Sequence, residues 1–144
     1  MQARLVDTNV LIVASAVDDG SRFRADATPV EEAALRQQVF DWLAAFEADP
    51  TRHAVLDVDW HVCGEYQHKL TDQDYGWLAM MHKMDRGEVV WVDVLLDKNG
   101  NAVLPPELAA AVTDLADRKM VAAALAALDA GHATQITNAS DTDW

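Results

Sequence analysis

The sequence predicts an α/β fold, in which helices alternate with the short strands of one mostly parallel sheet. Short apolar runs rich in β-branched residues recur along the chain, and segments with helical spacing and helix-capping residues separate them. Right-handed crossovers between such strands bring all their carboxyl ends to one edge of the sheet. Side chains that directly follow strands are therefore expected to meet at that edge.

The first half of the chain predicts two strands and three helices. The triplet Asp7-Thr8-Asn9 follows an apolar run and consists of residues that commonly begin helices. A capping-box pattern with Pro at 29 begins a second helix, which Asp49-Pro50 ends. The expected order is a strand over 3–7, a helix over 8–16, a polar loop over 17–29, a helix over 29–48, a strand over 53–58 and a helix over about 59–70.

The second half predicts two further strands and the remaining helices. Gly131 is a natural residue to end a long Ala-rich helical region, which we expect to break near 113–114. The expected order is a helix over 72–84, a strand over 89–96, a turn at 97–101, a short hairpin arm at 103–104, the helical region from 105, and a last strand over 133–137. The Trp-rich segment over about 72–106 is a candidate clamp, dimer surface or packing element.

Composition is consistent with one domain spanning 1–144. Hydrophobic residues make up 51% of the 144 residues, and a chain of this length buries about two thirds of its unfolded surface. No apolar stretch approaches the about 20 residues that cross a bilayer, and the first residues lack a signal-peptide pattern. We therefore expect a cytoplasmic protein without membrane attachment. Cys63, the one cysteine, is expected to be a buried small hydrophobic residue.

The chain carries a formal net charge of −13, from 24 acidic and 11 basic residues. Such a surface repels nucleic acid, so a nucleic-acid substrate would require metal ions or a local basic patch. Most of these carboxylates are expected to be solvated surface groups. Any carboxylate with a special role must therefore be identified by its position.

Four carboxylates occupy positions from which they can meet. Asp7 follows the first strand, Asp141 follows the last strand, and Glu65 and Asp117 lie in helices. Each also has an ordinary structural interpretation: Asp7 and Asp141 as helix caps, Glu65 as a solvated side chain, and Asp117 as the partner of a neighbouring basic residue or the cap of a helix break. Asp143 is an alternative to Asp141, and Asp114 an alternative to Asp117.

In order along the chain, these motifs resemble those of the PIN-domain family of metal-dependent nucleases. The matching motifs are Asp7-Thr8-Asn9 after an apolar strand, the pair Glu65-Tyr66 in a helix, Asp117 at the start of an Ala-rich helix, and Asp141 followed by Trp144. One position departs from the family pattern. The residue two before the last aspartate is Ala139, where the family often has Thr or Ser, and Ser140 or Thr137 are the available substitutes.

The resemblance implies a three-layer α/β/α fold with a Mg²⁺ or Mn²⁺ site. Asp7 would be the central metal ligand, Asp117 and Asp141 would complete the ligand set, and Glu65 would bind the metal or orient a metal-bound water. These four residues would also be the catalytic groups. Thr8 and Asn9 would support the loop that holds Asp7, and Ser140 and Asp143 are further supporting candidates.

Physical chemistry favours a metal at such a cluster. Two carboxylates 4 Å apart repel each other by about 4 kcal/mol at an effective dielectric of 20. Mg²⁺ and Mn²⁺ prefer oxygen ligands, and two such ions about 4 Å apart can stabilise both the attacking and the leaving oxygen of a phosphodiester. Four gathered carboxylates therefore make little structural sense without a cation.

Other residue types give weaker signals. The five histidines lack the spacing of helical metal ligands and are expected at the surface or in packing. The five tryptophans are expected mostly in the core, with Trp77 and Trp91 as the best interface candidates. Arg118 and Lys119 are candidate phosphate contacts, although solvated helix charges are the simpler interpretation.

The sequence thus favours a small metal-dependent endoribonuclease that acts on RNA. Its size resembles the toxin of a type II toxin–antitoxin pair, which a protein antitoxin holds inactive, and homodimerisation is a further possibility. The alternative is a catalytically degenerate PIN-fold module that binds protein or RNA. A phosphatase or phosphotransferase on another doubly wound fold is less favoured, because residue 9 is Asn and no Gly-rich phosphate loop is present.

Overall fold

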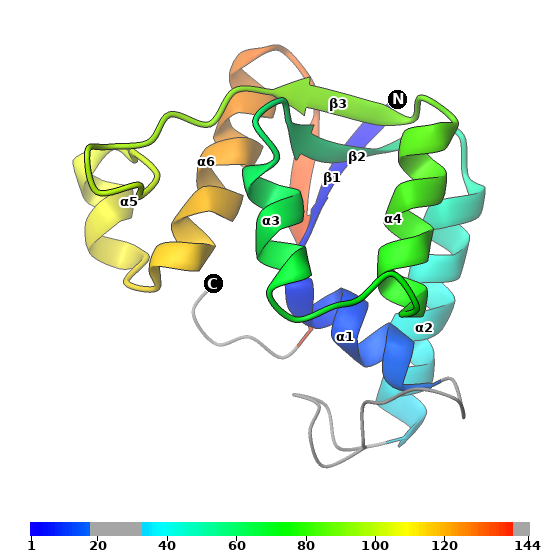
Figure 1. The fold of residues 1–144 in the computed structure, drawn as a ribbon. Helices are drawn as coiled ribbons and strands as arrows, with labels where there is room; N and C mark the ends of the chain where they lie inside the picture. Colours follow the sequence, from blue (N-terminus) through cyan, green and yellow to red (C-terminus); the bar gives the residue numbers. More distant parts are fainter. Residues whose placement is uncertain (18–32, 140–144) are drawn as a thin grey trace.

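The strands form one parallel sheet with the order β3-β2-β1-β4 (Figure 1). The computed structural model describes residues 1–17 and 33–139, and all structural statements below refer to them. The strands are β1 (Gln2–Val6), β2 (Arg52–Asp57), β3 (Val89–Val92) and β4 (Thr134–Thr137). The helices are α1 (Thr8–Ala16), α2 (Ala33–Ala48), α3 (His61–Gln67), α4 (Tyr75–Asp85), α5 (Pro106–Ala111) and α6 (Leu115–Asp129).

Helices cover the sheet in a three-layer α/β/α arrangement. Helices α1, α2 and α4 pack against one another, with α4 against β2, whereas α6 contacts all four strands. Figure 1 shows α2 and α4 together on one side of the sheet and α6 on the other. Buried alanines Ala123 and Ala127 let α6 lie close to the strands. The predicted α/β fold class with a parallel sheet is confirmed.

The direction of chain progression reverses at β1. The chain adds β2 and β3 on one side of β1 and returns to add β4 on the other side. In open parallel sheets, ligands bind beyond the carboxyl ends of the strands at such a switch point. Here that point lies beyond β1 and β4, where Val6 pairs with Thr137. The topology therefore directs attention to the residues that follow these two strands.

Several elements match the sequence prediction closely. Helix α1 has the expected bounds, and α5 and α6 are separated by three residues around the predicted break at 113–114. Gly131 has a φ of +91° just after α6, a conformation that favours glycine. The capping pattern at 28–31, and the predicted polar loop from residue 18 on, lie outside the described residues.

Three predicted elements are shorter in the structure. The strand expected over 89–96 ends at Val92, because its neighbour β2 ends at Asp57, the residue paired with Val92. The hairpin arm expected at 103–104 is reduced to a single antiparallel bridge between Leu96 and Ala102. The helix expected from 72 begins at Tyr75, because residues 71–74 form a turn closed by the Asp74 carboxylate.

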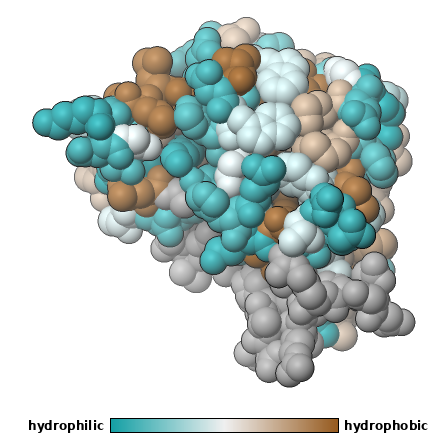
Figure 2. All heavy atoms as spheres, viewed as in Figure 1, coloured by the Kyte–Doolittle hydropathy of each residue, from teal (hydrophilic) through white to brown (hydrophobic). Residues whose placement is uncertain are grey.

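The prediction that the tryptophans lie mostly in the core is confirmed only in part for the described residues. Trp42 and Trp77 are half-buried against the core, while Trp60 and Trp91 are 36% and 47% exposed. Figure 2 shows pale side chains gathered over β3, the start of α3 and α4. Trp144 lies outside the described residues. Cys63 is buried as expected, and burial together with the nearby Asp57 carboxylate raises the pKa of its thiol to about 12.

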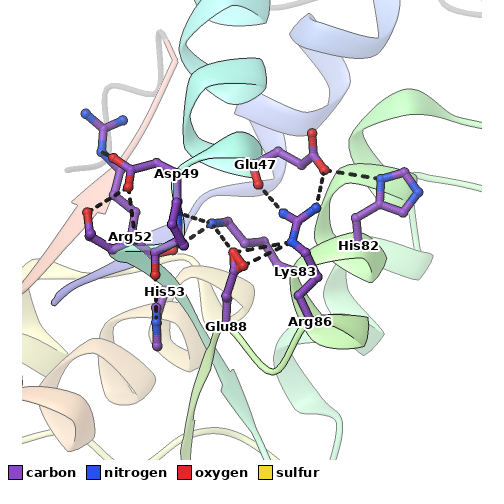
Figure 3. A network of polar contacts seen from close by, with 10 residues as sticks. Glu47, Asp49, Arg52, His53, His82, Lys83, Arg86 and Glu88 are labelled. Carbon is purple, nitrogen blue, oxygen red and sulfur yellow. Dashed lines mark hydrogen bonds and ion pairs between the residues drawn. The ribbon is translucent and has the colours of Figure 1, made fainter.

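An ionic cluster closes the amino edge of the sheet, where β2 and β3 begin (Figure 3). The fully buried Lys83 ammonium donates to the carbonyl oxygens of Asp49 and Arg52, at 2.7 Å each, and contacts Glu88 Oε1 at 3.2 Å. Arg86 binds the carboxylates of Glu47 and Glu88. We call Glu47, Asp49, Arg52, Lys83, Arg86 and Glu88 the amino-edge cluster.

No helix among the described residues is long and apolar enough to span a bilayer.

Candidate functional site

A cavity of about 370 Å³ lies at the carboxyl edge of the sheet, where the topology predicts a ligand site. The beginning of α1, the end of α3 and the first turns of α6 surround it. Its lining residues are Asp7, Thr8, Asn9, Ile12, Glu65, His68, Lys69, Asp114, Asp117 and Met120. Three of the four carboxylates predicted from the sequence thus line one cavity, although 110 residues separate the first from the last.

Asp7 is both a helix cap and a cavity residue. It follows β1 directly with extended backbone angles, and its Oδ2 accepts the N–H of Asn9 at 3.3 Å at the start of α1. The residue is only 4% exposed. Its own N–H donates to the carbonyl oxygen of Thr137 at 2.9 Å, so the end of β4 lies beside it. The two interpretations of Asp7 made from the sequence are therefore compatible.

Tyr66 connects α3 to the end of β1. Its fully buried hydroxyl donates to the carbonyl oxygen of Val6, at 2.5 Å, one residue before Asp7. Burial, followed by the neighbouring Cys63 and Asp7, raises the pKa of the Tyr66 phenol well above its ordinary value, so it remains a donor. This hydrogen bond fixes α3 against the strand and holds the adjacent Glu65 at the cavity.

The Glu65 carboxylate is engaged by two side chains from different elements. Lys119 of α6 donates to Oε1 at 2.8 Å, and His68 Nδ1 lies 3.2 Å from Oε2. The Glu65 side chain is 10% exposed. Neither the solvated interpretation of Glu65 nor that of Lys119 holds, because the two form an ion pair between α3 and α6.

Asp117 and Asp114 occupy different environments at the start of α6. Asp117 is 9% exposed, whereas Asp114 is exposed and accepts the Asp117 N–H at 3.4 Å from the position just before the helix. The structure therefore favours Asp117 as the inner carboxylate and Asp114 as the capping residue. Arg118 donates to the carbonyl oxygens of Val112 and Ala109 and so ties α5 to α6, instead of being a solvated charge.

The last predicted carboxylate lies outside the described residues, together with its alternative and its supporting serine: Asp141, Asp143 and Ser140. The chain reaches them from Thr137, which is paired with Val6, and from the buried Ala139.

Asp57 is a strand-end aspartate that the sequence interpretation did not single out. It ends β2, is 1% exposed, and accepts the N–H groups of His61 and Val62 at 2.8 and 2.7 Å. Both of its oxygens therefore cap the first turn of α3. Asp7 and Asp57 follow the same local pattern of strand and helix, and the pattern alone does not separate a cavity residue from a cap.

The donor set favours a hard metal ion but is incomplete in the described part of the chain. Asp7 and Asp117 supply buried carboxylate oxygens to one cavity, which are ligands that Mg²⁺ and Mn²⁺ prefer. Among residues 1–17 and 33–139, no three His, Cys, Asp or Glu side chains are grouped so that they could hold a metal. The described residues therefore supply two candidate ligands for a divalent ion, Asp7 and Asp117.

Comparisons with protein-family models, with curated proteins and with solved structures find no match to this chain. The resemblance to PIN domains therefore depends on the quoted motifs, to which the geometry adds a shared cavity for Asp7, Glu65 and Asp117.

Proposed function

We propose that this chain is a Mg²⁺- or Mn²⁺-dependent endoribonuclease of the PIN-domain type. The observation that supports it best is the burial of Asp7 and Asp117 around one cavity at the switch point of the sheet. Two carboxylates around one small cavity repel each other, and a divalent cation removes that cost. Phosphodiester hydrolysis is a reaction that uses such an ion.

In this proposal Asp7 and Asp117 hold the metal, and Asp141 supplies a third carboxylate from beyond the described residues. When bound, the ion would activate water and stabilise negative charge on the phosphate. Thr8 and Asn9 begin α1 and keep the Asp7 carboxylate at the end of β1. Glu65 lines the same cavity, but Lys119 and His68 engage its carboxylate, so in this proposal it supports the site and does not hold the metal.

The biological role is proposed as the toxin of a toxin–antitoxin pair that acts on RNA in the cytoplasm. The set of acidic motifs supports this role. A protein antitoxin and a second copy of the chain are the expected partners. A small reading frame that overlaps the start of the gene would support an antitoxin.

The test is cleavage of a single-stranded oligoribonucleotide with Mn²⁺ and with EDTA. Asp7→Asn removes the charge while asparagine still caps α1, so we expect folded protein with at least a thousandfold less activity, on the order of the loss seen when a catalytic group is removed. Asp129→Asn is the matched control, because it makes the same charge change at the exposed end of α6. Full activity in Asp7→Asn would refute the proposal.

A second candidate is a PIN-fold module that has lost catalysis and acts by binding protein or RNA. Two observations favour it: Lys119 and His68 engage Glu65, and the described residues hold no group of three metal ligands. Calorimetry separates the two functions, because the module would bind no Mn²⁺ at millimolar concentration.

A further inference from the structure

Basic side chains gather on one wall of the cavity in an otherwise acidic chain. His68 ends α3, Lys69 follows it, and both line the cavity. Lys119 of α6 donates to Glu65, which lines the cavity beside them, at 2.8 Å. The net charge of the chain is −13, so a substrate phosphate approaching this cavity needs local positive charge.

Glu65 is the centre of this wall. Its two oxygens contact Lys119 and His68 from two elements, and Tyr66 fixes the helix beneath it. With Nδ1 against Glu65, the other ring nitrogen of His68 is directed away from that carboxylate, and the imidazole is 68% exposed. A carboxylate engaged in this way acts as an anchor for its neighbours.

The two inner aspartates and the two basic side chains that line the cavity come from different elements. Asp7 and Asp117 lie on the side of α1 and α6, whereas His68 and Lys69 lie at the end of α3. Lysine ammonium groups bind phosphate as point charges. At physiological salt, charges act over about 8 Å, so nearby lysines outweigh distant carboxylates of the surface.

We propose that His68 and Lys119, which contact Glu65, and the adjacent Lys69 form a phosphate-binding wall that receives the RNA backbone beside Asp7 and Asp117. Glu65 is the positioning residue of this wall and is not a metal ligand. The inference rests on the proposed nuclease function and names the groups that bind its substrate.

The first experiment measures RNA binding without metal, so that cleavage does not contribute. Fluorescence anisotropy follows a single-stranded oligoribonucleotide in EDTA at several salt concentrations, with Lys69→Met, Lys119→Met and the control Lys98→Met. Lys98 is an exposed lysine in the turn after β3. We expect each of the first two variants to weaken binding at least about fivefold and to lower the salt slope by about one.

Two further variants guard this result against loss of folding. Lys119→Arg keeps the charge and should restore most of the binding that Lys119→Met loses. Lys69 is exposed, so Lys69→Met should fold and serves as the independent variant. The phosphate-binding wall is refuted if Lys69→Met and Lys119→Met bind RNA with the same affinity as the wild type and Lys98→Met. It is also refuted if neither the wild type nor any variant binds RNA.

The second experiment tests the role of Glu65 through metal affinity. Calorimetric titration with Mn²⁺ should give Glu65→Gln an affinity within about twofold of wild type, because Glu65 contacts Lys119 and His68 and not the proposed ligands. Asp7→Asn loses a ligand carboxylate and should bind more than about tenfold more weakly, beyond the lower limit for the loss of an outer-shell partner. An equal loss in both variants would make Glu65 a metal ligand and overturn its assignment. If Asp7→Asn instead cleaves RNA normally, the nuclease proposal fails, and the metal-free comparison still decides the wall.

Discussion

The two edges of the sheet use charged residues in opposite ways. At the amino edge, the Lys83 ammonium contacts three oxygens within 3.2 Å and lies 4.7 Å from the Phe46 ring centre. At the carboxyl edge, Asp7 and Asp117 face a cavity of about 370 Å³ with other acidic residues. One edge is filled with complementary charge, and the other surrounds a cavity with buried carboxylates and, at the end of α3, basic side chains.

Under the proposed function, this difference separates structural ionic groups from candidate functional ones in the same fold. A buried ion that is fully hydrogen-bonded fixes its neighbours and leaves no position for a ligand. Like charges around a cavity oppose folding and are retained where a ligand compensates them. Glu65 belongs to the first kind although it lies at the second edge, because Lys119 and His68 already engage it.

Helix α4 links the two edges. Lys83 lies near its end, whereas Gly76 near its beginning packs against Leu11 of α1, the helix that Asp7 caps. The N–H of Gly76 also donates to the buried Ser15 hydroxyl of α1 at 2.9 Å. Substitutions at the two ends of α4 therefore measure how much the contacts at each end contribute to the stability of the fold.

The largest loss of stability is expected from Lys83→Met at the amino edge. Removing the ammonium leaves Glu88 with one cationic partner fewer and two carbonyl oxygens without their donor, which should cost about 3–5 kcal/mol. Urea unfolding followed by circular dichroism measures it. A loss below about 1 kcal/mol would contradict the structural role of the amino-edge cluster.

Gly76→Ala should destabilise the contact between α4 and α1. An added Cβ would lie 2.5 Å from the Leu11 carbonyl oxygen and 2.7 Å from its Cβ, so backbone must move, at a cost of about 2–3 kcal/mol. Gly64→Ala is the matched control in α3, since nothing lies within 4 Å of its added Cβ. The control should gain up to about 1 kcal/mol. Equal effects in urea unfolding would refute the close approach.

The two strand-end aspartates should respond differently to the same substitution. Asp57→Asn turns an amide toward a backbone N–H that Asp57 now binds, and should cost about 1–3 kcal/mol. Asp7→Asn keeps a good helix cap and removes one of the gathered negative charges, so stability should change by less than about 0.5 kcal/mol or rise. A larger loss for Asp7→Asn would show that Asp7 is mainly structural.

The smallest effect is the pH dependence of the amino-edge cluster. Burial acts to raise the pKa of Glu88, but hydrogen bonds from Arg86 and Lys83 outweigh it and hold the pKa below its ordinary value of 4.5. Glu88 therefore binds a proton less readily in the folded state than in the unfolded state, so its ionised form stabilises the fold. This contribution to stability is lost as pH falls from 4.5 through the pKa of Glu88 in the folded state. The advantage of wild type over Glu88→Gln in urea midpoint should shrink in this range. An advantage that stays constant would contradict the contacts of Glu88.

Local signals in the sequence predicted much of this fold. The triplet Asp7-Thr8-Asn9 predicted the start of α1, because a cap depends on residues one turn apart. Asp114 and Gly131 marked the limits of α6 for the same reason. The end of β3 was not predictable locally, because it depends on where the neighbouring β2 stops.

The sequence predicted that Asp7, Glu65 and Asp117 would lie near one another, but it did not predict their contacts. Position after a strand or on a helix brought Asp7 and Asp117 to one cavity. The pairing of Glu65 with Lys119 spans 54 residues and depends on the packing of α3 against α6. Asp57 shares the local pattern of Asp7, and only the fold shows that its oxygens bind the N–H groups of α3.

The most direct test of the functional carboxyl edge is calorimetric titration of the folded protein with Mn²⁺, comparing wild type with Asp7→Asn and Asp129→Asn. We expect Mn²⁺ to bind the wild type and the Asp129→Asn control. We expect Asp7→Asn to bind Mn²⁺ at least about tenfold more weakly, because a ligand carboxylate is lost. Absence of binding to wild type at millimolar Mn²⁺, or equal affinity in Asp7→Asn, would contradict a metal site at this edge.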